Sequence, residues 1–384
     1  MSEKNPETSH VKTIRVVAGQ KNRRKIRGIE VVGIAALVAL IGAGAAVASM
    51  TANNKETTAS VVAGTPATTL KLGYFPNVTH APALIGVNEG IFAKNLGGTK
   101  LSTQVFNAGP SAIEALNAGA IDAAFLGPNP AINSFVKSSG ESIRIIAGAT
   151  SGGAQLVVKP EITSPAQLKG KVLATPQLGG TQDVALRSWL SDQGFATTPN
   201  GGGDVTINPT DNAGTLKLFQ NGKLDGAWLP EPWASRLVLE AGAKVLVNEA
   251  ELWEGGAFST TILVVNTSFL EQHPQTVEAL LAGNVESIDW LNEHKGKEAD
   301  AVNKALAAAA GKKLPANVID RSLANLTFSA DPLAATFPTL LAHGVTAGVG
   351  KQAVLSGIFD LRPLNATLAK QNQKPVSAAG LGSE

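Results

Sequence analysis

The 384-residue sequence contains no cysteine. Disulfide bonds, thiolate nucleophiles, Cys-ligated zinc, iron–sulfur clusters and lipid attachment through an N-terminal cysteine are therefore excluded. The histidines are few and lie at positions 10, 80, 273, 294 and 343, without the spacing of metal ligands. We therefore expect neither a metal site nor a cofactor.

Charge is also sparse. Charged residues make up 16% of the chain, and the formal net charge is only +2. The one conspicuous basic cluster lies at the extreme N-terminus, so no nucleic-acid partner is expected. The hydrophobic content of 44% predicts a well-buried interior, and the length suits two hydrophobic cores better than one.

The N-terminal 50 residues predict export. A polar, basic segment ends at Arg27, and an apolar run follows from Val31 to Val47. Ala46-Val47-Ala48 offers the small-x-small pattern that signal peptidase requires. Residues 1–50 are thus a cleaved signal peptide or a retained anchor that contacts the membrane, and residues 51–69 are a flexible linker. The remaining chain is expected in the periplasm or at the outer face of the cytoplasmic membrane.

From Leu70 onward, short β-like runs alternate with helical stretches, which predicts an α/β fold with a largely parallel sheet. Residues 119–126 recur as residues 222–229, with Gly, Asp, Ala, an aromatic residue and Leu matching at an offset of 103. Each copy predicts a helix ended by Gly, a turn with Asp and a buried strand, followed by a proline-rich loop. Chance similarity of common elements is the alternative, but two similar lobes fit better.

We therefore expect two Rossmann-like lobes around a central cleft. The first lobe comprises residues 70–155 and 266–362, the second comprises residues 156–265, and residues 363–384 form a C-terminal tail. Ligands of open α/β sheets bind outside the carboxyl ends of the strands. Both proline-rich loops should therefore lie at the cleft, which closes around its ligand by a hinge motion.

The most informative loop is Gln177-Leu178-Gly179-Gly180-Thr181, between a predicted strand and a predicted helix. The glycine pair allows close backbone approach, and Thr181 can cap the helix. Unpaired N–H groups at the helix N-terminus, together with the helix dipole, form a site suited to an anion. An ordinary glycine-rich turn is the equal alternative.

The first lobe offers further candidates. Gly109 and Ser111 belong to a second turn of the same kind, and Tyr74 can present either a hydroxyl or an apolar wall. His80 lies just beyond, although such a histidine is more often a surface residue whose hydrogen bonds are satisfied. Ser151 lies in a glycine-containing segment before the crossover and suits either a hinge or a ligand contact.

Two tryptophans, Trp228 and Trp233, flank Glu231. One indole is expected in the core, and the other is expected to form an aromatic wall for the apolar part of an organic anion. Glu231 is unfavourable beside an anion. It either pairs with Arg236 or recognises an amine on the ligand, and the sequence leaves both open.

Taken in order, several motifs resemble one family: Lys71-Leu72-Gly73-Tyr74, Gly90-Ile91-Phe92, Gly119-Ala120-Ile121-Asp122, Ala174-Thr175-Pro176-Gln177-Leu178-Gly179 and the segment from Asp225 to Ala234. They are similar to substrate-binding proteins of nitrate/sulfonate/taurine-type ABC importers, especially the aliphatic-sulfonate branch, from about Leu70 to Phe359. The resemblance implies a type II periplasmic-binding-protein fold, with two lobes, a central cleft and two hinge crossovers.

The resemblance also implies no catalysis, only capture of a small organic anion and its delivery to an ABC permease with an ATPase subunit. It implies ligand contacts from these loops: Tyr74, Ser111, Asn129, Ser151, Gln177–Thr181 and Trp228. The lipobox cysteine of many members is missing, which leaves the mode of tethering open.

Alternative functions remain. A binder for nitrate, bicarbonate or a neutral heterocycle shares the motifs, although tryptophans near the cleft favour a ligand with a carbon skeleton. Another alternative function is that of a ligand sensor that docks on a membrane receptor. The thiamine-pyrimidine synthases, which are similar intracellular enzymes, need a cysteine-rich motif that this chain lacks.

Overall fold

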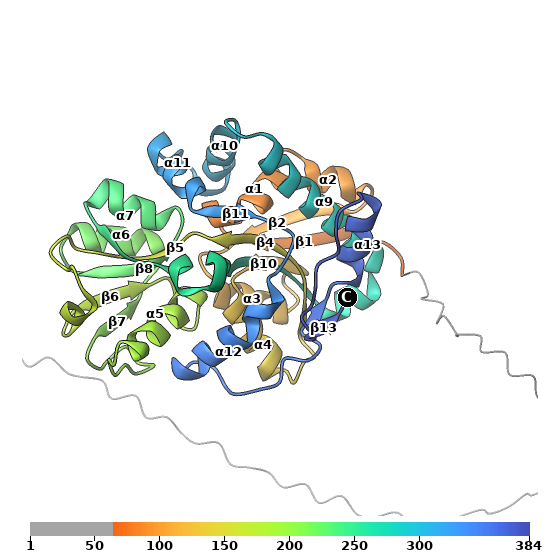
Figure 1. Cartoon of the computed structure of the whole chain (residues 1–384). Coiled ribbons are helices and arrows are strands. Elements are labelled where there is room, and N and C mark those ends of the chain that lie inside the picture. The colour runs from red at the N-terminus through yellow and green to blue at the C-terminus, as the bar shows by residue number, and fades with distance from the viewer. Residues whose placement is uncertain (1–63) are drawn as a thin grey trace, which may run out of the picture. The chain divides into compact units, whose positions relative to one another are not determined.

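The computed structural model describes residues 64–384. The predicted signal peptide or anchor and most of the predicted linker therefore lie outside the described residues. Within residues 64–384, two β-sheets with helices on their faces form two lobes (Figure 1). None of the helices in this part of the chain has the length and apolar character to cross a membrane.

The first lobe is built on an eight-stranded mixed sheet in the order β13-β12-β4-β10-β3-β1-β2, with β11 paired to β4. Strand β1 pairs in parallel with β2 and β3, whereas β10 runs antiparallel to β3 and β4. Its strands are β1 (Thr69–Tyr74), β2 (Lys100–Val105), β3 (Ala123–Leu126), β4 (Ile143–Gly152), β10 (Ser259–Asn266), β11 (Leu326–Phe328), β12 (Phe359–Asp360) and β13 (Gly382–Ser383).

The second lobe has a five-stranded sheet in the order β7-β6-β8-β5-β9. Its central strands are buried on both faces, which explains their nearly continuous apolar sequences. The strands are β5 (Ala154–Val158), β6 (Val172–Thr175), β7 (Thr206–Pro209), β8 (Gly226–Pro230) and β9 (Lys244–Asn248).

Helices cover the faces of both sheets. The α-helices of the first lobe are α1 (Ala81–Asn88), α2 (Ile91–Leu96), α3 (Gly109–Asn117), α4 (Pro128–Lys137), α8 (Thr267–Gln272), α9 (Pro274–Glu293), α10 (Glu298–Ala310), α11 (Ala316–Ala324), α12 (Phe337–Thr346) and α13 (Arg362–Lys370). Those of the second lobe are α5 (Thr181–Asp192), α6 (Asn212–Gln220) and α7 (Trp233–Ala241). Short 3-10 helices are η1 (Val78–His80), η2 (Pro165–Leu168), η3 (Glu249–Leu252), η4 (Glu254–Gly256) and η5 (Ala334–Thr336).

The two copies of the 103-residue repeat occupy equivalent places in the two sheets. The first copy follows α3 and contains β3, which pairs in parallel with β1. The second follows α6 and contains β8, which pairs in parallel with β6. In each copy the aspartate side chain accepts a hydrogen bond from a backbone N–H of the neighbouring strand: Asp122 from Lys71 at 2.8 Å, and Asp225 from Val172 at 2.9 Å. The repeated aspartate therefore ties the turn to the sheet.

Two crossovers connect the lobes, and they lie slightly away from the expected boundaries. The first runs from β4 to β5 through Gly152 and Gly153, both with positive φ, and the second runs through η3 and η4 to β10. Strand β10 belongs to the first sheet, whereas the sequence predicts that the second lobe extends over residues 156–265. Its register with β3 and β4 buries every residue up to Val265.

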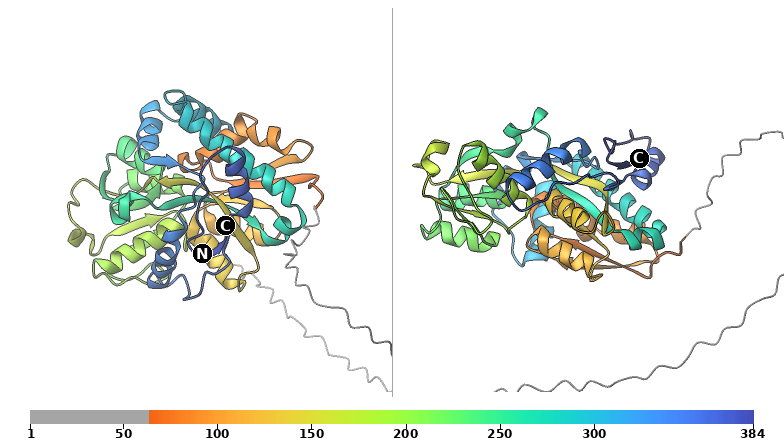
Figure 2. Two further views of the ribbon diagram at one scale, coloured as in Figure 1. Left: turned by 45° about the vertical axis from the view of Figure 1, so that its right-hand side comes forward. Right: turned by 90° about the horizontal axis from the view of Figure 1, so that it is seen from below.

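The expected C-terminal tail is part of the first lobe. Helix α13 packs against α9, and β13 pairs with β12, so Figure 2 shows the C-terminus lying against this lobe. Two other C-terminal helices reach across to the second lobe: α11 contacts α7, and α12 contacts α5. The two lobes are therefore connected by packing as well as by the crossovers.

Candidate ligand-binding site

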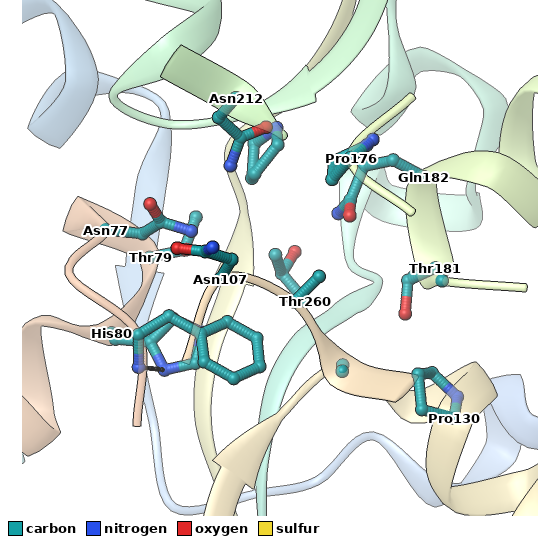
Figure 3. Close-up of a pocket in the computed structure, with 16 residues that line it drawn as sticks. Asn77, Thr79, His80, Asn107, Pro130, Pro176, Thr181, Gln182, Asn212 and Thr260 are labelled. Atoms are coloured by element: carbon teal, nitrogen blue, oxygen red, sulfur yellow. Dashed lines mark hydrogen bonds between the residues drawn. The ribbon is translucent and has the colours of Figure 1, made fainter. Parts of the chain in front are cut away.

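A cavity lies between the lobes at the carboxyl ends of the strands. Figure 3 shows Asn212, Pro176 and Gln182 of the second lobe facing Asn77 and Asn107 of the first. The residues that line the cavity are Phe75, Asn77, Thr79, His80, Asn107, Ala108, Gly109, Gly127, Pro130, Pro176, Gly180, Thr181, Gln182, Asn212, Pro230 and Thr260. None of these sixteen residues carries an ionised carboxylate, ammonium or guanidinium group.

Three helix N-termini meet at the cavity. The residues that precede the first turns of α3, α4 and α5 are Ala108, Gly127 and Gly180, and all three line it. None of these helix starts has a side-chain cap, so their first N–H groups are not satisfied by a capping side chain. Prolines in the first turns of α3 and α4 remove some of these donors, and α5 therefore offers the fullest set. Each helix also directs the positive end of its dipole towards the cavity.

Thr181 supplies a hydroxyl at the start of α5. Its side chain is 5% exposed, and Oγ1 has no hydrogen-bond partner within residues 64–384. Burying a hydroxyl without a partner is costly, so the group is suited to bind a ligand atom. Thr181 also touches the opposite lobe, because a Cβ built on Gly127 would overlap its hydroxyl. The lobes therefore meet directly at this edge of the cavity.

Asn212, the first residue of α6, also brings a buried polar side chain to the cavity. It is 7% exposed, and its Oδ1 atom likewise has no partner among the described residues. Helix α6 differs from the other three because Asp211 caps it, accepting a hydrogen bond from the N–H of Gly214 at 2.9 Å. The contribution of α6 to the cavity is therefore the Asn212 side chain more than the helix end.

His80 lies on the first-lobe side, 3% exposed, with its ring 4.3 Å from that of Phe75. Burial lowers the pKa of His80 to about 3, so the imidazole is neutral at physiological pH. Its Nδ1 atom accepts a hydrogen bond from the N–H of Phe75 at 3.4 Å. The proton of the neutral ring therefore lies on Nε2, which can donate a hydrogen bond.

Four of the residues predicted from sequence line the cavity together: His80, Gly109, Gly180 and Thr181. Gly179 has φ +73 and its N–H donates to Asp183, which shapes the turn beside the cavity without lining it. Gln177 belongs to the same turn, where its carbonyl accepts the N–H of Gly180.

Other predicted residues lie outside the lining. Ser111 donates to the carbonyl of Ala108 at 2.9 Å within α3, and the amide of buried Asn129 donates to the carbonyl of Leu340. Ser151 accepts a hydrogen bond from the N–H of Phe258 beside the crossover. Tyr74 is buried in the first-lobe core, where burial raises the pKa of its hydroxyl against an opposing hydrogen bond with Thr103.

The aromatic wall expected from the tryptophans is not in the lining. Trp228 is 0% exposed in the second-lobe core, 6.0 Å from the ring of Trp189, and donates to Glu249 at 2.7 Å. Burial raises the pKa of Glu249 to about 7, although the hydrogen bonds from Trp228 and Trp253 act in the opposite direction. The side chain of strand residue Trp228 points to the sheet face that α5 covers, so it packs inside the lobe.

Glu231 also differs from expectation, because its partner is Arg321 of α11 at 3.0 Å and not Arg236. Arg236 instead pairs with Glu240 at 2.9 Å. The nearby Trp233 donates from Nε1 to Oδ1 of Asn77 at 2.9 Å, which forms a direct hydrogen bond between the lobes. The second proline-rich loop therefore contributes Pro230 to the cavity and otherwise connects the lobes.

Sequence reasoning missed the amide side chains of the cavity. Asn77, Asn107 and Asn212 each follow a strand by two or three residues, and Gln182 is the second residue of α5. The rule that ligands bind at the carboxyl ends of strands could have identified them. Two of these side chains, those of Asn107 and Gln182, lie in or beside the same loops as the predicted glycines.

Comparison with known proteins supports the fold. The model of the NMT1-like family matches residues 63–307. The chain is 28% identical over 207 residues to the taurine-binding periplasmic protein of Escherichia coli, with 54% of this chain and 62% of that protein covered. It is 28% identical over 255 residues to the nitrate/nitrite binding protein NrtA of Nostoc sp., with 60% and 56% covered. The chain thus spans less than two thirds of the length of these relatives.

Among solved structures, the fold is similar to that of the alkanesulfonate-binding protein SsuA from Xanthomonas axonopodis pv. citri bound to MOPS. The TM-score is 0.62 at 20% identity, and the match covers 75% of this chain and 96% of that one. The predicted type II periplasmic-binding-protein fold is therefore confirmed, and the cavity lies in its central cleft.

Proposed function

The chain belongs to the NMT1-like family, and we propose that it is the solute-binding protein of an ABC importer that captures a small organic anion. It would act outside the cytoplasm and deliver the ligand to a permease with its ATPase subunit. The observation that carries this proposal is the meeting of three uncapped helix N-termini at one cavity. Helix dipoles and free N–H groups bind an anion without needing a cationic side chain.

The hydrogen-bond donors of the cavity support the same ligand class. The hydroxyl of Thr181 and the neutral imidazole of His80 add donors to the N–H groups of α5. Phe75, Pro176 and Pro230 supply apolar surface for a short carbon skeleton. The relative named for nitrate agrees with a small anion as the ligand, whereas the ligand of the relative named for taurine joins a sulfonate to an ammonium group and agrees in its sulfonate part only.

The interlocked lobes suit capture and release. Contact between Gly127 and Thr181 and the hydrogen bond between Trp233 and Asn77 both cross the cleft. Opening the cleft would break both contacts, and a ligand that bridges the lobes would favour the closed form. The site would thus bind without catalysis, since binding requires only these donors and closure.

Isothermal titration calorimetry on the detergent-solubilised full chain tests this function. The ligands are methanesulfonate, ethanesulfonate, propane-1-sulfonate, nitrate and bicarbonate, with a neutral pyrimidine for comparison and chloride as the salt control. We expect saturable binding of an alkanesulfonate, which Gly180→Val should weaken by crowding the start of α5. Binding of the pyrimidine together with no binding of any anion would show that the ligand is neutral.

A further inference from the structure

The residues around the cavity also predict which anions are rejected. Amides, hydroxyls and one neutral imidazole make up the polar lining, and no carboxylate faces the cavity. A ligand ammonium group would lose its hydration on entry and needs a carboxylate or several acceptors to replace it. Three carboxylates, those of Asp183, Asp211 and Glu231, lie next to lining residues in the chain.

Asp183, in the first turn of α5, is fully engaged. Its Oδ1 atom accepts the hydroxyl of Thr175 at 2.8 Å, and Oδ2 accepts both the N–H of Gly179 and Nε of Arg187 at 2.9 Å. Both members of the Asp183–Arg187 pair are 0% exposed. Turning this carboxylate towards a ligand would break the loop and leave a buried guanidinium unpaired.

Glu231 follows the lining residue Pro230, and its carboxylate is also fully engaged. Arg321 and Asn325 donate to Oε1 at 3.0 and 2.9 Å, and the N–H of Ser235 donates to Oε2 at 3.0 Å. Its side chain is 0% exposed, and its donors come from α7 and α11, outside the lining. The Glu231 carboxylate, which from sequence was a candidate to recognise a ligand amine, therefore already has protein partners.

Asp211 is the remaining carboxylate beside a lining residue. It is exposed to solvent, and its side chain caps α6 through the N–H of Gly214. It lies next to Asn212 in the chain but is not part of the cavity wall. An ammonium group inside the cavity would thus find only uncharged acceptors among the lining residues, such as Oδ1 of Asn212, and the positive ends of the helix dipoles would repel it.

We propose that the site selects anions that carry no ammonium group, so that it binds propane-1-sulfonate and rejects taurine. The two compounds have nearly the same shape, with a methyl group in one where the other carries an ammonium. This inference rests on the proposed anion-binding function and adds the specificity of the site. The uncharged lining between the engaged carboxylates of Asp183 and Glu231 carries it.

The test compares propane-1-sulfonate with taurine by calorimetric titration of the full chain at pH 7. We expect taurine to bind at least about 100-fold more weakly than propane-1-sulfonate. The free energy that corresponds to this difference in affinity is smaller than the cost of burying an ammonium group without a partner. Taurine affinity equal to or above that of propane-1-sulfonate would overturn the specificity but leave the proposed function intact. Binding of no anion at all would overturn the proposed function, and the specificity with it.

A charge substitution sharpens the test. Asn212→Asp places a carboxylate at the buried position whose oxygen has no partner among residues 64–384, without changing the shape of the side chain. It should lower propane-1-sulfonate affinity and move the taurine-to-propane-1-sulfonate ratio at least about tenfold towards taurine. Asn107→Asp, at an exposed lining position, is the matched control and should change the ratio less. A folded Asn212→Asp variant with an unchanged ratio contradicts the inference.

Discussion

The two copies of the repeat share one scaffold and serve different purposes. Both consist of a helix ended by a glycine in the left-handed conformation, an aspartate that binds the neighbouring strand, and a buried strand. In the first copy the strand leads into Gly127, whose missing side chain lets Thr181 approach from the opposite lobe. In the second copy it leads into Glu231, which binds α11 of the first lobe.

The difference shows how one strand–loop unit acquires two functions. The first copy forms part of the cavity and the start of α4, whereas most of the second copy's loop joins the lobes outside the cavity. The shared features are those that the sheet needs, namely the terminating glycine and the aspartate. The loops beyond the strands are where the two copies diverge, as expected for segments that carry function.

Replacing Glu231 with Ala should have the largest effect on stability. The change leaves the Arg321 guanidinium without its carboxylate and the Ser235 N–H without its side-chain acceptor. We expect the free energy of unfolding to fall by about 3 kcal/mol, in the range for breaking a buried ion pair. Urea denaturation of the full chain, followed by tryptophan fluorescence, measures it.

Pro128 occupies the matching position of the first copy, 103 residues earlier. Pro128→Ala should cost less than about 1 kcal/mol, because it removes no hydrogen bond and only loosens the first turn of α4. Equal losses at Glu231 and Pro128 would mean that the ion-pair network does not set the second copy apart.

Gly127→Val tests the contact that distinguishes the first copy. The added side chain would overlap the hydroxyl and Cβ of Thr181 and keep the lobes apart. We expect binding of propane-1-sulfonate to weaken by about 10- to 100-fold, since overpacking costs a few kcal/mol at most. Calorimetric titration gives the dissociation constant.

Gly98→Val is the control for Gly127→Val. Gly98 is exposed, has no positive φ, and nothing lies within 4 Å of a Cβ built on it. Its affinity should match that of the unaltered chain. If Gly127→Val closes normally and binds with full affinity, the Gly127–Thr181 contact does not limit closure.

Two hydroxyls at the helix starts of opposite lobes allow a finer comparison. Thr181→Val removes an unpartnered hydroxyl inside the cavity while keeping the size of the side chain, and Ser111→Ala removes one that is bonded to Ala108 outside it. We expect Thr181→Val to weaken anion binding by about tenfold, as for one hydrogen bond to a charged group. Ser111→Ala should leave affinity unchanged, and the opposite order would place the anion at α3.

The sequence predicted the fold well because its signals are local. Alternating apolar runs and the glycine–aspartate pattern identified the repeat, and the sheet places both copies in equivalent positions. The site was harder to predict because it depends on contacts between distant segments. Nothing near Glu231 shows that Arg321, 90 residues later, will occupy its carboxylate. The direction in which Trp228 points depends on strand register, and a register difference of one residue reverses it.

The smallest expected effect distinguishes the aspartates that the two copies share. Burial opposes the charge of Asp225, but Lys159, at 2.8 Å, and the N–H of Val172 outweigh it and lower its pKa. A lowered pKa means that the folded chain releases this proton more readily than the unfolded chain. The stabilisation is therefore complete above the unfolded pKa near 4 and is lost as the pH falls through the lower folded pKa.

Asp225→Asn should lower the free energy of unfolding by about 1 kcal/mol at pH 7 and reduce the loss of stability in acid. Asp122, which lacks a lysine partner among residues 64–384, should lose less on the matching Asp122→Asn change, and urea denaturation at pH 7 and pH 3 measures both. If the two variants lose stability equally at pH 7, Lys159 adds nothing to the second copy, and the aspartates act through the strand N–H alone.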